Sequence, residues 1–276
     1  MSEQALQKTL YLIGAMLLLI FCLLPFIYML ITSVSLDPTF LAKNADFSFT
    51  LSNYISILSI KSLHFIDYFK NSFIISAISA VFCIIIASFA AYSITRLKLA
   101  GKFTIMLLVL AFSLFPQISI INYLFKMMAH FNLINTYAAI IPPYIAWGIP
   151  ITLWILVSYF SKIPVELDQA GLIDGCSRWQ ILRYIIFPVA LPGIFSALLI
   201  VFIFNFNEFM FALILTTNHG AQTIPVGIAL FQGLHGEIPW GTIMAASTIT
   251  TIPIILLSLF FQKRIIQGLT QGAIKA

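Results

Sequence analysis

Two polar residues, Asn205 and Glu208, interrupt a long apolar stretch and could do chemistry inside a membrane. They are three positions apart, so an unbroken helix would present both side chains on one face. An acid buried in hydrocarbon costs several kcal/mol unless it is paired, so Glu208 is a functional candidate by default. A helix cap, or a position at the wet outer mouth of a pathway, explains Glu208 equally well, and both interpretations stay open.

A second polar group lies earlier in the chain, within the apolar stretch 103–126. Its members carry amide or phenol groups that can hydrogen-bond an uncharged polar solute. They are Gln117, Asn122 and Tyr123. With Asn205 and Glu208 they form the set that we expect along a polar pathway.

The composition identifies the solvent for most of the chain as lipid. Of 276 residues, 61% are hydrophobic and 8% are charged. A soluble domain carries about 25% charged residues, and this chain has too few to cover a surface in water. Uncharged stretches long enough for helices of about 20 residues predict six membrane spans. Their expected bounds are about 9–35, 72–96, 103–126, 136–160, 188–214 and 241–262.

The basic residues predict how these spans are oriented. With the N-terminus inside, ten of the 14 Lys and Arg residues fall on the cytoplasmic side, as the positive-inside rule requires. The four expected outside are Lys43, Lys61, Lys70 and Lys126. The sequence therefore predicts one all-α integral membrane domain over residues 1–276, with both termini inside. The basic residues form no single patch, so nucleic acid is not an expected partner.

Neither a metal nor a nucleotide site is expected in this chain. Three Cys and four His residues are scattered without metal-ligand spacing. The phosphate-binding pattern G-x-x-x-x-G-K-[ST] is missing, because Gly101-Lys102 is followed by Phe103 and lacks the earlier glycine. Any ATP must then bind to a partner.

The largest outer loop, 37–70, contains the alternating segment 47–54. This segment is predicted to be an extended linker, with a short strand as the alternative.

The cytoplasmic loop 161–184 differs from the other connections because it is rich in charge. Pro164 suits the first position of a helix, and acids at 166 and 168 would lie in its opening turns. Asp174-Gly175 predicts a break. Ser177 and Gln180 have the spacing of a capping box, which begins a second helix. The loop is therefore predicted to form a helix-turn-helix at the inner membrane face.

Small residues on this element suggest one use for it. Ala170, Gly171 and Gly175 would let the first helix press its backbone into a groove on another protein. An ordinary interfacial hairpin has the same spacing, so the residues alone leave both interpretations open.

The loop also resembles the EAA motif of ABC importer permeases, which reads Glu-Ala-Ala, three residues, Gly, nine residues, then Ile-x-Leu-Pro. Here Gln169-Ala170-Gly171 stands in place of Glu-Ala-Ala, and Gly175 and Ile185 fall at the motif's spacing. Phe187 replaces Leu before Pro188. Because Gln169 has no carboxylate, Asp168 or Glu166 is expected to supply one.

Other segments narrow the resemblance to the second permease of maltose-type carbohydrate importers. They are Ala90–Arg96, Leu133–Thr136, Phe206–Phe209 and Phe261–Lys275. In this order they cover nearly the whole chain.

This resemblance implies a type I ABC importer permease fold in the bacterial cytoplasmic membrane, with no catalysis in this chain. The implied partners are a second homologous permease, a dimeric ABC ATPase that holds ATP and Mg, and an extracytoplasmic sugar-binding protein. The loop helix would dock on the ATPase, and the residues implied to couple the two proteins are Glu166, Asp168, Gln169, Ala170, Gly171, Asp174, Gly175 and Pro188. The tail, 263–276, would contact it through Gln271, Gly272 and Lys275. The cargo would be a sugar, such as trehalose or maltose.

Two other functions remain to be weighed. An ion-gradient transporter needs ionisable residues at the midplane, and Glu208 is the one acid in a predicted span. A glycerol phosphate importer would need a basic residue in the bore, and none is well placed.

Overall fold

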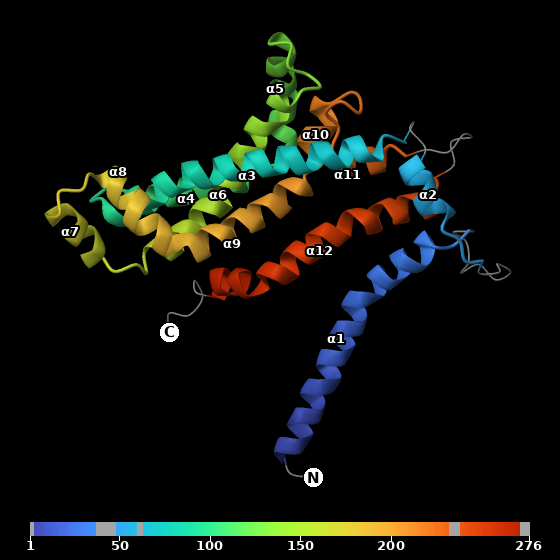
Figure 1. The fold of residues 1–276 in the computed structure, drawn as a ribbon, viewed down its shortest axis with the longest axis horizontal. Helices are drawn as coiled ribbons and strands as arrows, with labels where there is room; N and C mark the ends of the chain where they lie inside the picture. Colours follow the sequence, from blue (N-terminus) through green and yellow to red (C-terminus); the bar gives the residue numbers. More distant parts are fainter. Residues whose placement is uncertain (1–2, 37–47, 60–62, 232–237, 271–276) are drawn as a thin grey trace. The chain divides into compact units, whose positions relative to one another are not determined.

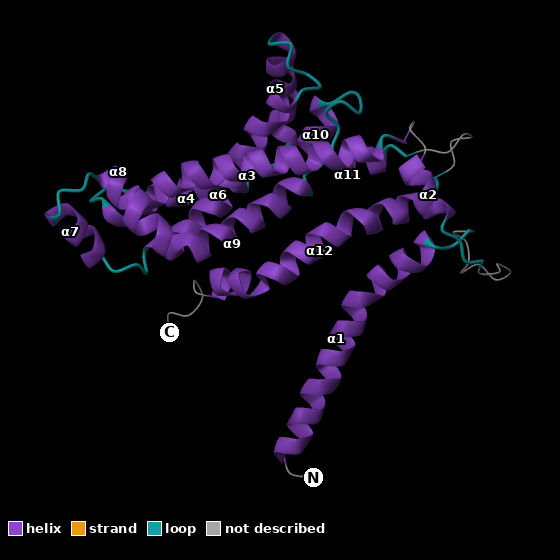
Figure 2. Ribbon diagram, in the orientation of Figure 1, coloured by secondary structure: helices purple, strands orange, loops and turns teal. Residues whose placement is uncertain are grey.

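The protein is built from helices, as the computed structural model shows for residues 3–36, 48–59, 63–231 and 238–270 (Figures 1 and 2). The helices are α1 Glu3–Ser33, α2 Ser52–Ser59, α3 Phe65–Arg96, α4 Lys102–Ser113, α5 Ile118–His130, α6 Tyr137–Phe160, α7 Glu166–Ile173, α8 Arg178–Ile181, the π-helical segment η2 Leu182–Ile186, α9 Phe187–Phe206, α10 Met210–Leu215, α11 Ile224–Ala229 and α12 Trp240–Thr270. The only pairing of extended backbone in these ranges is one isolated bridge between Ser35 and Phe49. The predicted all-α class is confirmed.

Five helices within the described ranges are long and apolar enough to cross a membrane. A sixth span is possible if α4 and α5 are counted together, although an 85° bend separates them. The bend falls at the segment around Pro116, whose ring cannot continue a helix that begins before it. The stretch predicted as the straight span 103–126 is thus two helices that point in different directions.

Other helices differ from the predicted spans at their ends. The predicted span 188–214 ends at Phe206, and the residues after it form the separate helix α10. Helix α3 begins at Phe65 instead of 72, and α12 runs on to Thr270, into the segment predicted as a tail. By contrast, α6 continues through Pro142, Pro143 and Pro150 over nearly the range predicted.

The chain folds into two compact units, which are described separately. The first comprises residues 1–65 and 228–252. In it, the amide of Asn53 on α2 donates to the carbonyls of Ser33 and Ser35 at 3.0 Å. The segment predicted as an extended linker instead passes through the bridge at Phe49 into α2. Helix α1 presents apolar side chains all round, and none of its most apolar window is buried.

The second unit comprises residues 66–227 and 253–276, and its core lies between α6 and α9. Glycines allow these two helices to approach closely, as is common in membranes. A Cβ at Gly193 would lie 2.3 Å from the ring of Tyr159, and one at Gly148 would lie 2.7 Å from Val201. Helices α7 and α8 lie at one end of this unit, and α10 lies at the other (Figure 1). The coupling residues predicted on α7 and the pathway residue Glu208, which precedes α10, therefore lie at opposite ends of this unit.

Candidate functional site

Helix α7 and the turn after it follow the local signals in the sequence closely. The helix begins at Glu166, two residues after the proline predicted to open it. Gly175 has φ +79°, a left-handed conformation that glycine adopts without the strain of a Cβ. The capping box is confirmed: the amide of Gln180 donates to Ser177 Oγ at 3.3 Å, and the amide of Ser177 donates to Gln180 Oε1 at 2.7 Å.

The inner face of α7 is held by a buried ion pair with α3. Arg96 Nε lies 3.0 Å from Asp168 Oδ2, and both side chains are 3% exposed. The hydroxyl of Tyr92, one turn earlier on α3, donates to Asp168 Oδ1 at 3.1 Å. Arg96 also donates to the carbonyl of Ile163, just before α7, at 2.8 Å. Such a pair is stable only with supporting hydrogen bonds, because both charges have left water.

This position changes the expected role of Asp168. The sequence suggests that Asp168 or Glu166 replaces the missing carboxylate at 169 on the docking surface. Because Asp168 points inward and is paired within the chain, its carboxylate does not lie on the exposed face of α7. Glu166 remains exposed and can supply the carboxylate.

Gly171 is also turned inward. A Cβ at this position would lie 2.9 Å from Ile185 Cδ1 and 3.0 Å from Ile181 Cγ1. Its small size therefore lets α7 pack against α8 and η2 within the chain, which is a different use from the close approach to another protein considered above. A Cβ at Gly175, in contrast, would have no other atom within 4 Å, and Ala170 is exposed.

The outer face of α7 carries one exposed stripe. Glu166, Gln169, Ala170 and Ile173 follow the i, i+3, i+4, i+7 spacing of a single helix face, and all four are exposed. Ile173 is 86% exposed, the most of any large apolar side chain in the described part of the chain. Sequence reasoning missed Ile173, although its spacing from Glu166 could have revealed it.

Pro188 lies at the start of α9, directly after the π-helical segment η2. Proline has no N–H to donate to the carbonyl four residues before it, and its ring would clash there. A wider π turn removes that clash, and such turns are frequent at functional sites. Pro188 thus shapes the passage from the loop into α9, and α8, η2 and α9 follow one another without a break.

At the other end of the unit, Asn205 and Glu208 do not share a helix face. Helix α9 ends at Phe206, and Asn207 is its C-cap. Asn205 is 1% exposed and faces α6 near Gly148, where its side-chain oxygen and nitrogen have no hydrogen-bond partner among the described residues.

Glu208 caps α10. Its carboxylate accepts hydrogen bonds from the amides of Phe211 at 3.0 Å and Ala212 at 3.3 Å. Tyr144 on α6 donates to the backbone carbonyl of Glu208 at 3.3 Å. Of the two interpretations left open by the sequence, the structure favours the cap: the side chain is 8% exposed and its oxygens bind backbone.

The other pathway candidates lie apart from these two residues. Gln117 is the N-cap of α5, after the bend. Asn122 and Tyr123 lie on the exposed side of α5, and Tyr123 is 75% exposed. The structure therefore does not bring the five candidates together at one site within this chain.

The loop after α10 is held by two asparagines. Asn71 on α3 donates to the carbonyls of His219 and Gln222, each at 2.9 Å. Asn135 Oδ1, before α6, accepts from the amides of Thr217 and Asn218 at 3.0 Å. The end of this unit that carries α10 is thus fixed by side chains that bind loop backbone.

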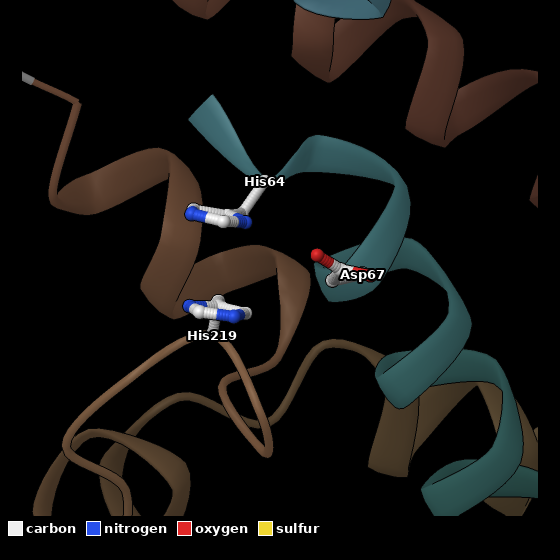
Figure 3. Close-up of side chains that lie close together, drawn as sticks. All are labelled: His64, Asp67 and His219. Carbon is white, nitrogen blue, oxygen red and sulfur yellow. The ribbon is translucent and has the colours of Figure 1, made fainter. Parts of the chain in front are cut away.

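Figure 3 shows the side chain of His219, from this loop, near Asp67 in the first turn of α3. A ring nitrogen of His219 and a carboxylate oxygen of Asp67 lie within 4.8 Å of each other. The spacing along the sequence did not predict that these two side chains lie close together, because their proximity depends on the loop that Asn71 holds. At the C-terminus, Gln271, Gly272 and Lys275 lie outside the described residues.

Replacing Asp168 by Ala should destabilise the protein by about 3–5 kcal/mol, because Arg96 would remain buried without a partner. Thermal unfolding of the purified protein measures this loss. Glu166→Ala, which removes an exposed acid from the same helix, should leave the melting temperature nearly unchanged. Equal melting temperatures for the two variants would contradict the proposed anchoring role of Asp168.

Replacing Glu208 by Ala should cost about 1–3 kcal/mol, because the amides of Phe211 and Ala212 would lose their acceptors in a buried place. Glu208→Gln keeps one acceptor oxygen and should lose less stability. Thermal unfolding combined with an uptake assay separates the two roles. If Glu208→Gln melts normally but abolishes uptake, the charge itself is needed and the cap is not its main role.

Comparison with known proteins places the chain in one family. Residues 84–271 match the family described as "Binding-protein-dependent transport system inner membrane component". The chain is 51% identical over 276 residues to the trehalose/maltose transport system permease protein MalG of Thermococcus litoralis, covering 100% of this chain and 99% of that protein. It is 37% identical over 259 residues to the trehalose transport system permease protein SugB of Mycobacterium tuberculosis, covering 92% and 93%.

Solved structures agree on the fold. A chain of a bacterial ABC transporter involved in the import of the acidic polysaccharide alginate superposes with a TM-score of 0.75 at 20% identity, covering 95% of this chain and 98% of that one. The predicted resemblance and the predicted membrane location are both confirmed. The chain belongs to the family of binding-protein-dependent transport system inner membrane components and is a multi-pass inner-membrane permease.

Proposed function

We propose that this permease forms half of a sugar-conducting pore and couples it to ATP hydrolysis by a partner ATPase. The observation that carries the proposal is the division of α7 into two faces. Its inner face is held by Arg96, and its outer face exposes Ile173 to water beside polar residues. An exposed apolar side chain on a firmly held helix is suited to insertion in a groove on another protein.

The proposed cargo follows from the relatives. MalG of Thermococcus litoralis is named for trehalose and maltose, and SugB of Mycobacterium tuberculosis is named for trehalose. A relative in Agrobacterium fabrum at 36% identity is named for sulfoquinovosyl glycerol, also a carbohydrate. We therefore favour a sugar, and a disaccharide such as trehalose or maltose in particular.

The proposed partners are a second homologous permease, a dimeric ABC ATPase and an extracytoplasmic sugar-binding protein. ATP and Mg would bind to the ATPase, since this sequence contains no phosphate-binding loop of the G-x-x-x-x-G-K-[ST] type. The role of this chain would then be mechanical, without catalysis of its own.

In this mechanism, closure of the ATPases on ATP displaces α7. The ion pair between Asp168 and Arg96 transmits the displacement to α3. The close contact of Gly171 with Ile181 and Ile185 transmits it to α9 through the continuous helix. The pore would open outward to accept sugar and return inward after hydrolysis.

The gradient-driven alternative is disfavoured at Glu208, the acid that the sequence places in a predicted span. Such a transporter needs an acid that can exchange protons or ions. The carboxylate of Glu208 is already engaged by two backbone amides, which disfavours that role.

Replacing Ile173 by Asp should abolish recovery of the ATPase. Burying an isoleucine is worth about 1.5–3 kcal/mol, and an unpaired charge in the groove adds a further penalty, so binding should weaken at least about tenfold. The measurement is co-purification with the tagged permease from gently solubilised membranes. Leu99→Asp, at an exposed apolar residue of the other inner loop, serves as the matched control.

Three outcomes can be distinguished. Loss of the ATPase only in Ile173→Asp, with the second permease retained, supports docking through α7. Equal recovery in both variants contradicts it. Recovery of the wild-type chain without any ATPase contradicts the importer itself. For the cargo, uptake of labelled trehalose and maltose into proteoliposomes should require both ATP and the binding protein.

A further inference from the structure

A groove of about 590 Å³ opens between α3 and the continuous helix formed by α8, η2 and α9, all within the second unit. The groove has no role in the mechanism proposed above. Its lining residues are Ile85, Ser88, Phe89, Trp179, Leu182, Arg183 and Phe187.

The lining comes from one face of each helix. On α3, Ile85, Ser88 and Phe89 follow i, i+3, i+4 spacing. On the opposite side, Trp179 and Arg183 are four residues apart on a face that Phe187 continues. The groove therefore runs lengthwise between two helices, as an extended molecule would require.

The aromatic side chains of the groove are of a kind found where the hydrocarbon of a membrane meets the headgroups. The rings of Phe89 and Trp179 stack with centroids 5.5 Å apart and an interplanar angle of 17°. Both side chains are about half exposed. Tryptophan is enriched where the hydrocarbon meets the headgroups, and Trp179 lies on α8, near the end of the predicted cytoplasmic loop.

The groove has one cation without a counter-charge. Arg183 is exposed, and among the described residues its guanidinium contacts the ring of Tyr184, with no acid as a partner. Ser88 borders the same groove but is 3% exposed, and its hydroxyl is buried without a hydrogen-bond partner in the part of the chain that is described.

We propose that this groove binds an anionic phospholipid of the cytoplasmic leaflet. The guanidinium of Arg183 binds the lipid phosphate. One acyl chain lies along the apolar lining beside Ile85 and Phe187. Basic pockets between membrane helices on the cytoplasmic side are suited to such headgroups.

The charge distribution favours a lipid over a protein helix. A helix of another subunit that filled the groove would bury Arg183 without a counter-charge unless it carried an acid, and an unpaired buried charge is costly. A phospholipid is complementary to the groove along its length: its anionic phosphate would lie at Arg183, and its acyl chain would lie along the apolar lining. The site also adjoins α8, so its occupant would contact the element that links α7 to α9.

Removing the cation should weaken lipid retention. Arg183→Gln should retain about tenfold less phosphatidylglycerol than the wild type, because a charge-assisted hydrogen bond to the phosphate is lost. Native mass spectrometry of the permease, purified with its accompanying subunits and supplied with defined lipid, measures the retained molecules. Arg183→Lys should retain most of the lipid. Lys98→Gln, at an exposed basic residue of the other inner loop, should behave as the wild type.

Two further arms separate the alternatives. Phosphatidylcholine, with no net charge, should be retained poorly by wild type and Arg183→Gln alike, and free glycerol phosphate should not displace the lipid. Displacement by free glycerol phosphate would identify a soluble anion as the ligand and overturn the proposal. Unchanged lipid retention in Arg183→Gln would also overturn it, and loss of the second permease in that variant would assign the groove to a subunit interface.

Discussion

The buried ion pair between Arg96 and Asp168 is the interaction on which the inner end of the second unit depends. Two charges removed from water hold together only when additional polar groups complete their hydrogen bonds. Here Tyr92 supports the carboxylate, and the carbonyl of Ile163 supports the guanidinium. Any displacement of α7 away from α3 would separate charges in an apolar surrounding. The low-energy response to a force on α7 is therefore a movement of α7 and the inner end of α3 together.

This constraint explains why the two faces of α7 differ so sharply. The residues turned inward, Asp168 and Gly171, are suited to electrostatic attachment and close packing. The exposed stripe beginning at Glu166 and ending at Ile173 is left for contact with another molecule. The replacement of Glu by Gln169 is tolerable in this arrangement, because Glu166 lies one turn earlier on the same face and keeps an exposed carboxylate there.

Local features were predictable from the sequence because their causes are local. The break at Gly175, the capping box of Ser177 and Gln180, and the extent of α6 depend on residues within a few positions. The direction of Asp168 was not predictable in this way, because its partner Tyr92 is 76 residues away in the chain. The end of α9 was missed for a related reason: the apolar pattern continues past Phe206, and only the cap by Glu208 marks where a new helix starts.

The attachments of α7 also define how it can act on the pore. One attachment, through Asp168, leads to α3, and the other, through Gly171 and Ile185, leads into the helix that becomes α9. A helix fixed at a single point could swivel without moving its neighbours. Fixed at two points that lead to two different spans, α7 cannot turn unless both spans follow. The π turn before Pro188 interrupts the regular helix between α8 and α9. Because it interrupts regular α-helical hydrogen bonding, it is where a bend would cost least as the spans rotate.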